Sequence, residues 1–155
     1  MKKYDLYGMG NALVDMEFEV PDAFLETMGV EKGFMTLVDE GRQFELLEFL
    51  RVERGVRSGG GSAANSVVAN ALFGGTSFYT CLVSNDEMGD FYVSELARAG
   101  VDTNLSDRRP DGVTGKCLVM ITPDAERTMN TYLGISESLS EAQLCEDALR
   151  DSEFL

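Results

Sequence analysis

The chain has 155 residues, of which 44% are hydrophobic, and a formal net charge of −14. That length and apolar content suffice for one domain with a sizeable core, and they exclude a disordered polymer. The acidic balance argues against nucleic acid and against an anionic membrane surface as partners, because both require clustered Lys and Arg. No apolar run approaches the length needed to span a membrane.

Histidine is absent, and the three cysteines, Cys81, Cys117 and Cys145, are far apart. The missing histidine excludes Ser-His and Cys-His nucleophiles and the usual zinc sites, so we expect no metal ligands. Without a CxxC pair or a secretory signal, the cysteines are predicted to be reduced core residues of a cytoplasmic protein. Any chemistry must then depend on carboxylates, amides, backbone N–H groups or an arginine.

Strand and helix patterns alternate along the N-terminal half. Continuous or alternating apolar residues predict strands, whereas apolar residues three or four apart predict helices that caps and glycines delimit. The expected elements are a buried strand over 4–14 broken by Gly8-Met9-Gly10-Asn11, an exposed strand over 16–20, a short helix from Pro21 to Gly29, a strand over 33–38, a helix that Asp39 caps and that carries Phe44, Leu47 and Leu50, and a weak strand over 52–58.

Gly59-Gly60-Gly61 then leads directly into a helix pattern that Gly74-Gly75 ends. Glycines let backbone N–H groups face outward, and a helix start adds unpaired N–H groups and the positive end of its dipole. Such a turn suits an oxygen-rich ligand such as a sugar or a phosphate; a tight turn with a cap is the alternative. The apolar face of the helix is expected to hold Ala63, Ala64, Val67, Val68, Ala71 and Leu72.

The second half continues the alternation. Its expected elements are a strong strand over 76–83, a helix that Asn85-Asp86 caps and Gly100 ends, a hairpin of 117–121 and 127–133, and a helix from a capping box at Ser140 to about Arg150. The order predicts an α/β domain with a small β element added. Because Phe154-Leu155 is apolar, we expect a further buried strand there, and a fold that the rest of the polypeptide or another chain completes.

Polar residues follow the first strand and open the main helix, where ligand crevices of open α/β sheets lie. Asp15 can accept two hydrogen bonds from vicinal hydroxyls, and the amides of Asn11 and Asn65 can donate and accept. With Gly60 and Gly61, they form the candidate binding set. A solvated carboxylate is the alternative for Asp15, and a turn-capping amide is the alternative for Asn11.

Two nucleotide-binding motifs are incomplete. Gly8-Met9-Gly10-Asn11-Ala12-Leu13 begins like a dinucleotide fingerprint, but Leu13 occupies the third glycine position. Gly112-Val113-Thr114-Gly115-Lys116-Cys117 has the wrong glycine spacing for a P-loop, and cysteine replaces the residue that would hold magnesium. Both interpretations are rejected.

Four segments in order along the whole chain carry a family likeness. They are Gly8–Asp15, Gly59–Asn65 with its helix to Gly75, Val83–Gly89 with Ser84 where Gly is commoner, and Thr114–Gly134. Together they resemble the ribokinase/PfkB family of ATP-dependent sugar and nucleoside kinases. The resemblance implies a ribokinase-like fold over 1–155, with a mostly parallel sheet, helices on both faces and a small β lid from about 16–38 and 115–133.

By the same resemblance, Asp15, Gly60, Gly61 and Asn65 would hold the acceptor sugar, and the first-strand and Arg-Thr-Met segments favour adenosine-type nucleosides. Met35 and Leu133 are expected to line a base pocket, with packing of the lid on the core as the alternative. An arginine at the position of Arg127 approaches the phosphates in similar nucleoside kinases, and an exposed hairpin charge is the alternative here.

The family's second signature, Asp-Thr-x-Gly-Ala-Gly-Asp, does not occur in these residues. In the family it supplies the anion hole and the catalytic base. The resemblance therefore implies that ATP and Mg²⁺ bind mainly outside this chain and that the chain alone is inactive as a kinase. Its expected partners are a sugar or nucleoside, the remainder of the kinase and a second copy through the lid. A non-catalytic sugar- or nucleoside-binding domain is the alternative.

Overall fold

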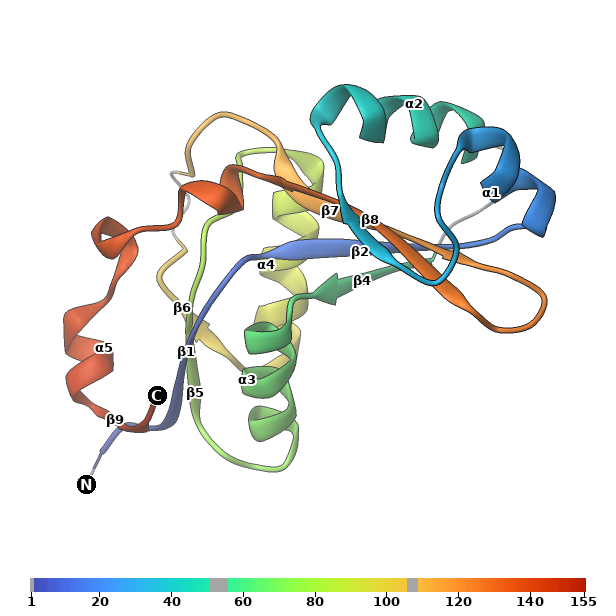
Figure 1. Cartoon of the computed structure of the whole chain (residues 1–155). Helices are drawn as coiled ribbons and strands as arrows, with labels where there is room; N and C mark the ends of the chain where they lie inside the picture. Colours follow the sequence, from blue (N-terminus) through green and yellow to red (C-terminus); the bar gives the residue numbers. More distant parts are fainter. Residues whose placement is uncertain (1, 51–55, 106–108) are drawn as a thin grey trace.

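The computed structural model describes residues 2–50, 56–105 and 109–155. It contains two sheets, which lie side by side and carry separate sets of helices (Figure 1). The first sheet has the order β6-β5-β1-β9, and the second has the order β3-β8-β7-β2-β4. The chain passes from the first sheet to the second directly, because β1 and β2 are consecutive strands.

The first sheet is parallel throughout and has helices on both faces. On one face, Tyr79 packs against α3 and α4; on the other, Phe78 packs against Ala148 of α5 and stacks on Tyr7 with ring centroids 5.4 Å apart. This confirms the predicted α/β class. The elements are β1 (Tyr4–Met9), β5 (Ser77–Thr80), β6 (Asp102–Thr103), β9 (Ser152–Phe154), α3 (Ser62–Leu72), α4 (Glu87–Ala99) and α5 (Glu146–Arg150).

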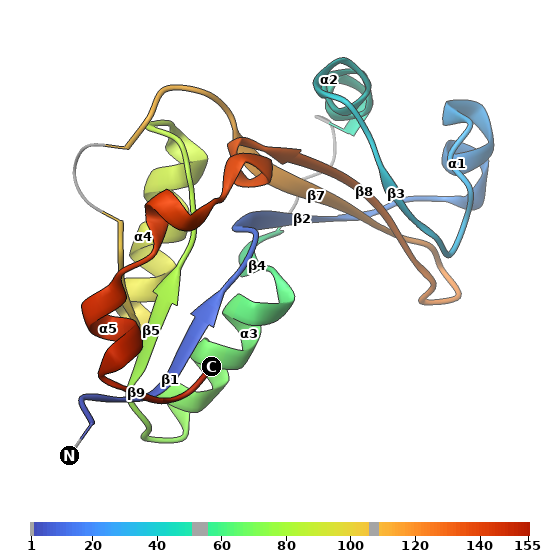
Figure 2. The same ribbon diagram turned by 60° about the vertical axis from the view of Figure 1, so that its left-hand side comes forward.

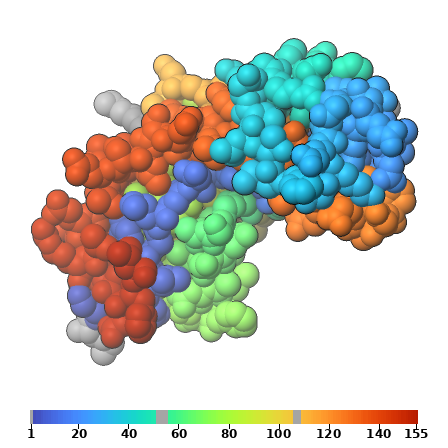
Figure 3. Space-filling view, viewed as in Figure 1, coloured from blue at the N-terminus to red at the C-terminus, as the bar shows by residue number. Residues whose placement is uncertain are grey.

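The second sheet has helices on one face only. Phe18, Leu118 and Met120 pack beneath α1 and α2 in a separate apolar cluster. Figures 2 and 3 show this sheet and its two helices projecting from the first sheet as a distinct lobe. The elements are β2 (Leu13–Glu19), β3 (Met35–Leu37), β4 (Val56–Gly60), β7 (Thr114–Ile121), β8 (Arg127–Gly134), α1 (Asp22–Met28) and α2 (Glu40–Leu50).

Local signals place the helix ends where the sequence predicts them. Asp86 caps α4 by accepting a hydrogen bond from the backbone N–H of Gly89 at 2.8 Å. Gly29 and Gly100 end α1 and α4 in the left-handed conformation that glycine adopts without strain. The break near Gly8–Asn11 also occurs, and it separates β1 from β2.

Other expectations are wrong in detail. The capping box of Ser140 and Gln143 is present, but it caps a short 3₁₀ turn, and only Glu146–Arg150 is α-helical. Leu72, which was expected on the apolar face of its helix, is exposed, as is Phe44. The C-terminal strand forms beside β1 as the edge strand of the described sheet, but Phe154 is exposed rather than buried.

One sequence prediction falls partly on residues that the structure does not describe. Of the weak strand predicted over 52–58, positions 52–55 lie outside the described residues, and β4 begins at Val56.

None of the described helices is long and apolar enough to cross a membrane. The three cysteines are free; Cys81 and Cys117 are buried, and Cys145 is half-buried.

Candidate functional site

Two turns meet where the chain leaves the first sheet, and they bring four predicted residues together. A methyl group built on Gly60 would lie 2.3 Å from Asp15 Oδ1, and one built on Gly61 would lie 2.5 Å from the backbone oxygen of Asn11. Gly61 also has φ +104, a conformation that side chains rarely adopt. Close approach to the first strand therefore requires glycine at both positions.

Two tyrosines that the sequence analysis did not single out fix these turns. The Tyr79 hydroxyl donates to the backbone oxygen of Asn11 at 3.2 Å, and the Tyr92 hydroxyl donates to that of Gly60 at 2.9 Å. Burial raises the pKa of both tyrosines, so the hydroxyls keep their protons and stay donors. The turns are thus anchored from the core of the first sheet.

Strand register places the remaining candidates on one face of the second sheet, opposite α1 and α2. Direct partners in a ladder project to the same side, as do residues two apart in one strand. Asp15 pairs with Ser58 of β4 and with Cys117 of β7. The row of Asp15 continues through Thr131 and Leu37, and the adjacent row contains Glu17, Val119, Met129 and Met35. We call this surface the open face.

Asp15 carries the most distinctive electrostatics of the open face. The carboxylate accepts no hydrogen bond from any residue in the described part of the chain, and it is half-buried. Burial raises its pKa, which the charge of Arg127 opposes and that of Glu17 reinforces. Arg127 is exposed, and its nearest carboxylate oxygen is that of Glu17 at 3.8 Å. An unpaired carboxylate beside backbone glycines suits a ligand that donates hydrogen bonds, such as a diol.

Two residues that were predicted to line a base pocket flank the row of Asp15 on the open face. Met35 is exposed on β3 in the adjacent row, and Leu133 is half-buried beside Gly115 on the other side of the row. Cys117 and Thr131 were missed, although they lie between Asp15 and Leu37 in the register. The Thr131 hydroxyl donates to Cys117 Sγ at 3.2 Å, and burial raises the pKa of this thiol. Cys117 thus presents a neutral side chain.

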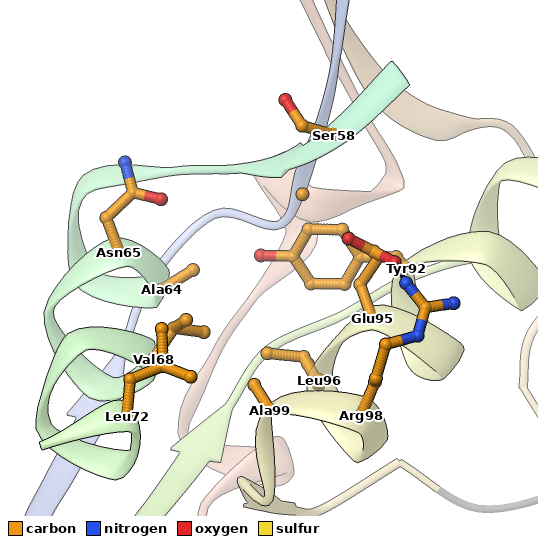
Figure 4. A pocket seen from close by; sticks show the side chains of 11 residues that line it. Ser58, Ala64, Asn65, Val68, Leu72, Tyr92, Glu95, Leu96, Arg98 and Ala99 are labelled. Carbon is orange, nitrogen blue, oxygen red and sulfur yellow. Dashed lines mark hydrogen bonds and ion pairs between the residues drawn. The ribbon is translucent and has the colours of Figure 1, made fainter. Parts of the chain in front are cut away.

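Asn65, another predicted polar residue, lies outside the strand ladder that contains Asp15. It is exposed in the first turn of α3, at the rim of a hollow between α3 and α4 (Figure 4). The hollow has a volume of about 290 Å³, and Tyr92 and Leu96 lie at its base. Gly59 faces this hollow, whereas Gly60 faces Asp15.

Comparison with known proteins identifies the wider group. The model of the pfkB family of carbohydrate kinases matches residues 36–155. Adenosine kinase of Schizophyllum commune is 26% identical over 96% of this chain and 43% of its own length, and guanosine-inosine kinase of Escherichia coli K12 is 26% identical over 96% and 35%. The chain thus spans less than half the length of these curated relatives.

Solved structures agree with this result. Adenosine kinase from Sinorhizobium meliloti superposes with a TM-score of 0.87 at 32% identity, over 98% of this chain and 47% of that one. A probable sugar kinase from Rhizobium etli CFN 42 superposes with a TM-score of 0.89 at 29% identity, over 99% and 47%. With the family match covering most of its residues, the chain belongs to the pfkB family of carbohydrate kinases.

Proposed function

We propose that this chain forms the acceptor-binding part of an ATP-dependent kinase that phosphorylates a hydroxyl of a ribonucleoside of the adenosine type. The observation that carries the proposal is the unpaired Asp15 carboxylate facing Gly60 across the β2–β4 ladder. A ribose offers two adjacent hydroxyls to such a carboxylate. Adenosine kinases among the similar proteins favour a nucleoside over a simple sugar.

Each residue has a distinct task in this proposal. Asp15 accepts hydrogen bonds from the two hydroxyls, while Asn11, Asn65 and the backbone at Gly61 fix the orientation of the ring. Met35, Leu133, Cys117 and Thr131 would contact the base. The lid, predicted over 16–38 and 115–133, would exclude water, which competes with the sugar as phosphate acceptor. We extend it to Val56–Gly60, since β4 belongs to the same sheet.

Arg127 would contribute positive charge near the phosphate acceptor. It lies at the start of β8 on the same side as Asp15, and its charge opposes the rise in the pKa of that carboxyl. Its exposure and its long contact with Glu17 leave the side chain available for a ligand, because surface pairs of this kind contribute about 0–1 kcal/mol.

We propose that ATP and Mg²⁺ bind mainly to residues outside this chain, in the remainder of the kinase. The support is the resemblance, because the family's second signature, which supplies the anion hole and the catalytic base, does not occur in these residues. In this proposal the chain alone binds nucleoside without phosphorylating it. A cytoplasmic location and a homodimer through the second sheet remain predictions.

The test is calorimetric titration of adenosine into the wild-type chain and into Asp15→Ala. A lost hydrogen bond to a charged group corresponds to about 1.5–3 kcal/mol, so we expect affinity to fall about tenfold or more. Asp147→Ala is the matched control, since that carboxylate on α5 is 98% exposed and distant in the fold. Affinity of Asp15→Ala within about threefold of wild type would remove Asp15 from the site.

A non-catalytic sugar- or nucleoside-binding domain is the second candidate, since the family's second signature does not occur in these residues. The two are separated by assaying the full-length protein with ATP, Mg²⁺ and a panel of sugars and nucleosides. Phosphorylation of a nucleoside supports the kinase, whereas binding without turnover across the panel supports the second candidate.

A further inference from the structure

A polar cavity, separate from the hollow between α3 and α4, lies on the side of the second sheet that faces away from Asp15. It has a volume of about 450 Å³, within the range of small-molecule sites. Its walls come from the end of α1, from β3, from the start of α2 and from β8, and Figure 2 shows β3 passing between the two helices beside β8. Its polar lining residues are Glu31, Thr36, Asp39, Arg42 and Asn130.

Asn130 is the observation that points to a ligand. Its side chain is 4% exposed, and its Nδ2 makes no hydrogen bond. Gln43, a buried amide on the same side of the sheet, is satisfied, because its Nε2 donates to the backbone oxygen of Lys116 at 2.9 Å. Buried amides are almost always paired, since an unpaired donor loses its hydration without compensation. Asn130 is an exception in a cavity wall.

The other polar groups define what the cavity can accept. Arg42 is committed, because its guanidinium donates to Glu45 and to the backbone oxygen of Met28. Glu31 and Asp39 also line the cavity, and they disfavour an anion. Asp39 Oδ1 accepts a hydrogen bond from the backbone N–H of Arg42 at 2.7 Å, which leaves its second oxygen. A ligand must therefore donate to these carboxylates and pair with the Asn130 amide, and a hydroxyl, which donates and accepts, can do both.

The apolar part of the lining narrows the choice further. Among the described residues of the wall, the apolar side chains are the aliphatic Val30 and Val38, and none is aromatic. Leu37 also borders the cavity on the edge strand β3, but the register directs its side chain to the open face. A flat base would lack the aromatic platform on which such rings stack. We propose that this cavity binds a small neutral polyhydroxylated molecule of sugar size, at a site separate from the one that contains Asp15. This inference does not rest on the proposed function.

The experiment titrates D-ribose into isotope-labelled Asp15→Ala protein, in which the open-face site is disabled, and follows backbone amide NMR signals. We expect signals of residues 29–31 and 36–39 to shift. Asn130→Leu, added to Asp15→Ala, should weaken this binding about tenfold or more, which corresponds to the loss of one polar anchor. Ribose 5-phosphate should bind more weakly than ribose, because Glu31 and Asp39 repel its charge.

Thermal melting checks that Asn130→Leu stays folded, and Glu31→Gln supplies an independent variant because Glu31 is exposed. Weaker ribose binding in either folded variant supports the proposal. Absence of shifts at 29–31 and 36–39, unchanged binding in both variants, or tighter binding of ribose 5-phosphate would overturn it.

Discussion

The two sheets of this chain differ in how many of their faces helices cover. The first sheet packs helices against both faces, and its aromatic residues Tyr7, Tyr79 and Phe78 are buried. The second sheet packs helices against one face only, and its open face carries an unpaired carboxylate, Asp15 on β2, and exposed Met35 and Leu37 on β3. From this comparison we infer that the first sheet mainly serves stability, and we propose that a ligand covers the exposed part of the open face of the second sheet.

Two carboxylates show the same contrast at the level of single groups. Asp86 accepts hydrogen bonds from the Thr114 hydroxyl and N–H and from Gly89 N–H; although burial opposes the change, these bonds lower its pKa. Asp15 has no such donors, and burial raises its pKa. Asp86 is satisfied by its own chain and serves the fold, and we propose that Asp15 is left for a ligand.

Replacing Gly60 should give the largest effect on binding. Gly60→Val places a β-branched side chain where even a methyl group would lie 2.3 Å from Asp15 Oδ1. We expect adenosine affinity to fall by more than about a hundredfold, or ~2.7 kcal/mol. Gly60 is not in the left-handed region, so the cause is steric rather than backbone strain. Affinity is measured by calorimetry and stability by thermal melting.

Gly59→Ala is the matched control for Gly60→Val. A methyl group there has ordinary contacts, the nearest being Glu95 Cβ at 3.7 Å, and it faces the hollow beside α4 rather than Asp15. It should leave affinity unchanged. A large fall in the melting midpoint of Gly60→Val with unchanged affinity in the folded fraction would mean that Gly60 serves the turn alone.

Replacing Asp86, whose carboxylate accepts hydrogen bonds within the chain, should lower stability and leave adenosine affinity unchanged. Asp86→Ala deletes the cap of α4 and the bonds that tie α4 to Thr114 at the start of β7. Loss of such a cap corresponds to about 0.5–2 kcal/mol, measured as a lower urea midpoint at constant slope. Adenosine affinity should stay as in wild type. If Asp86→Ala weakens binding as much as Asp15→Ala does, the proposed division between the two carboxylates fails.

The smallest effect is expected from Asp15→Asn on stability. Burial raises the folded-state pKa of Asp15 above its ordinary 3.8, so the contribution of this group to stability is fully present below pH 3.8 and is lost as pH rises through the raised value. Asparagine has no charge to lose or gain. The variant should therefore melt slightly above wild type at pH 7, and the difference should vanish below pH 3.8. A lower midpoint at pH 7 would show that the charged form is stabilised.

Local signals explain what the sequence could predict. Asp86, Gly29 and Gly100 act over one helical turn, so their helix ends follow from the sequence alone. The proximity of Asp15 to Gly60 followed from the family likeness. Cys117 and Thr131 were missed because strand register joins residues more than 100 positions apart, and alternation within one strand does not reveal its partners.

Packing between distant parts of the chain explains why the predicted helix after Ser140 was wrong and why Asn130 was not predicted. The Ser140 capping box is a correct local signal, but the chain turns after Gln143 and Leu144 packs toward Tyr7 and Phe78, so the helix restarts only at Glu146. The unpaired amide of Asn130 had no sequence signal at all, since an asparagine within a strand gives no indication of whether its side chain finds a partner.

The central claim is that the open face of the second sheet, together with the glycine turn, binds a nucleoside. The most direct measurement is a backbone amide NMR titration of the wild-type chain with adenosine. The account predicts shifts concentrated at Asn11, Asp15, Gly60, Gly61 and the row of Cys117 and Thr131, with α1 and α2 unaffected. Shifts confined to α1, α2 or the hollow between α3 and α4, or no saturable shift, would contradict it.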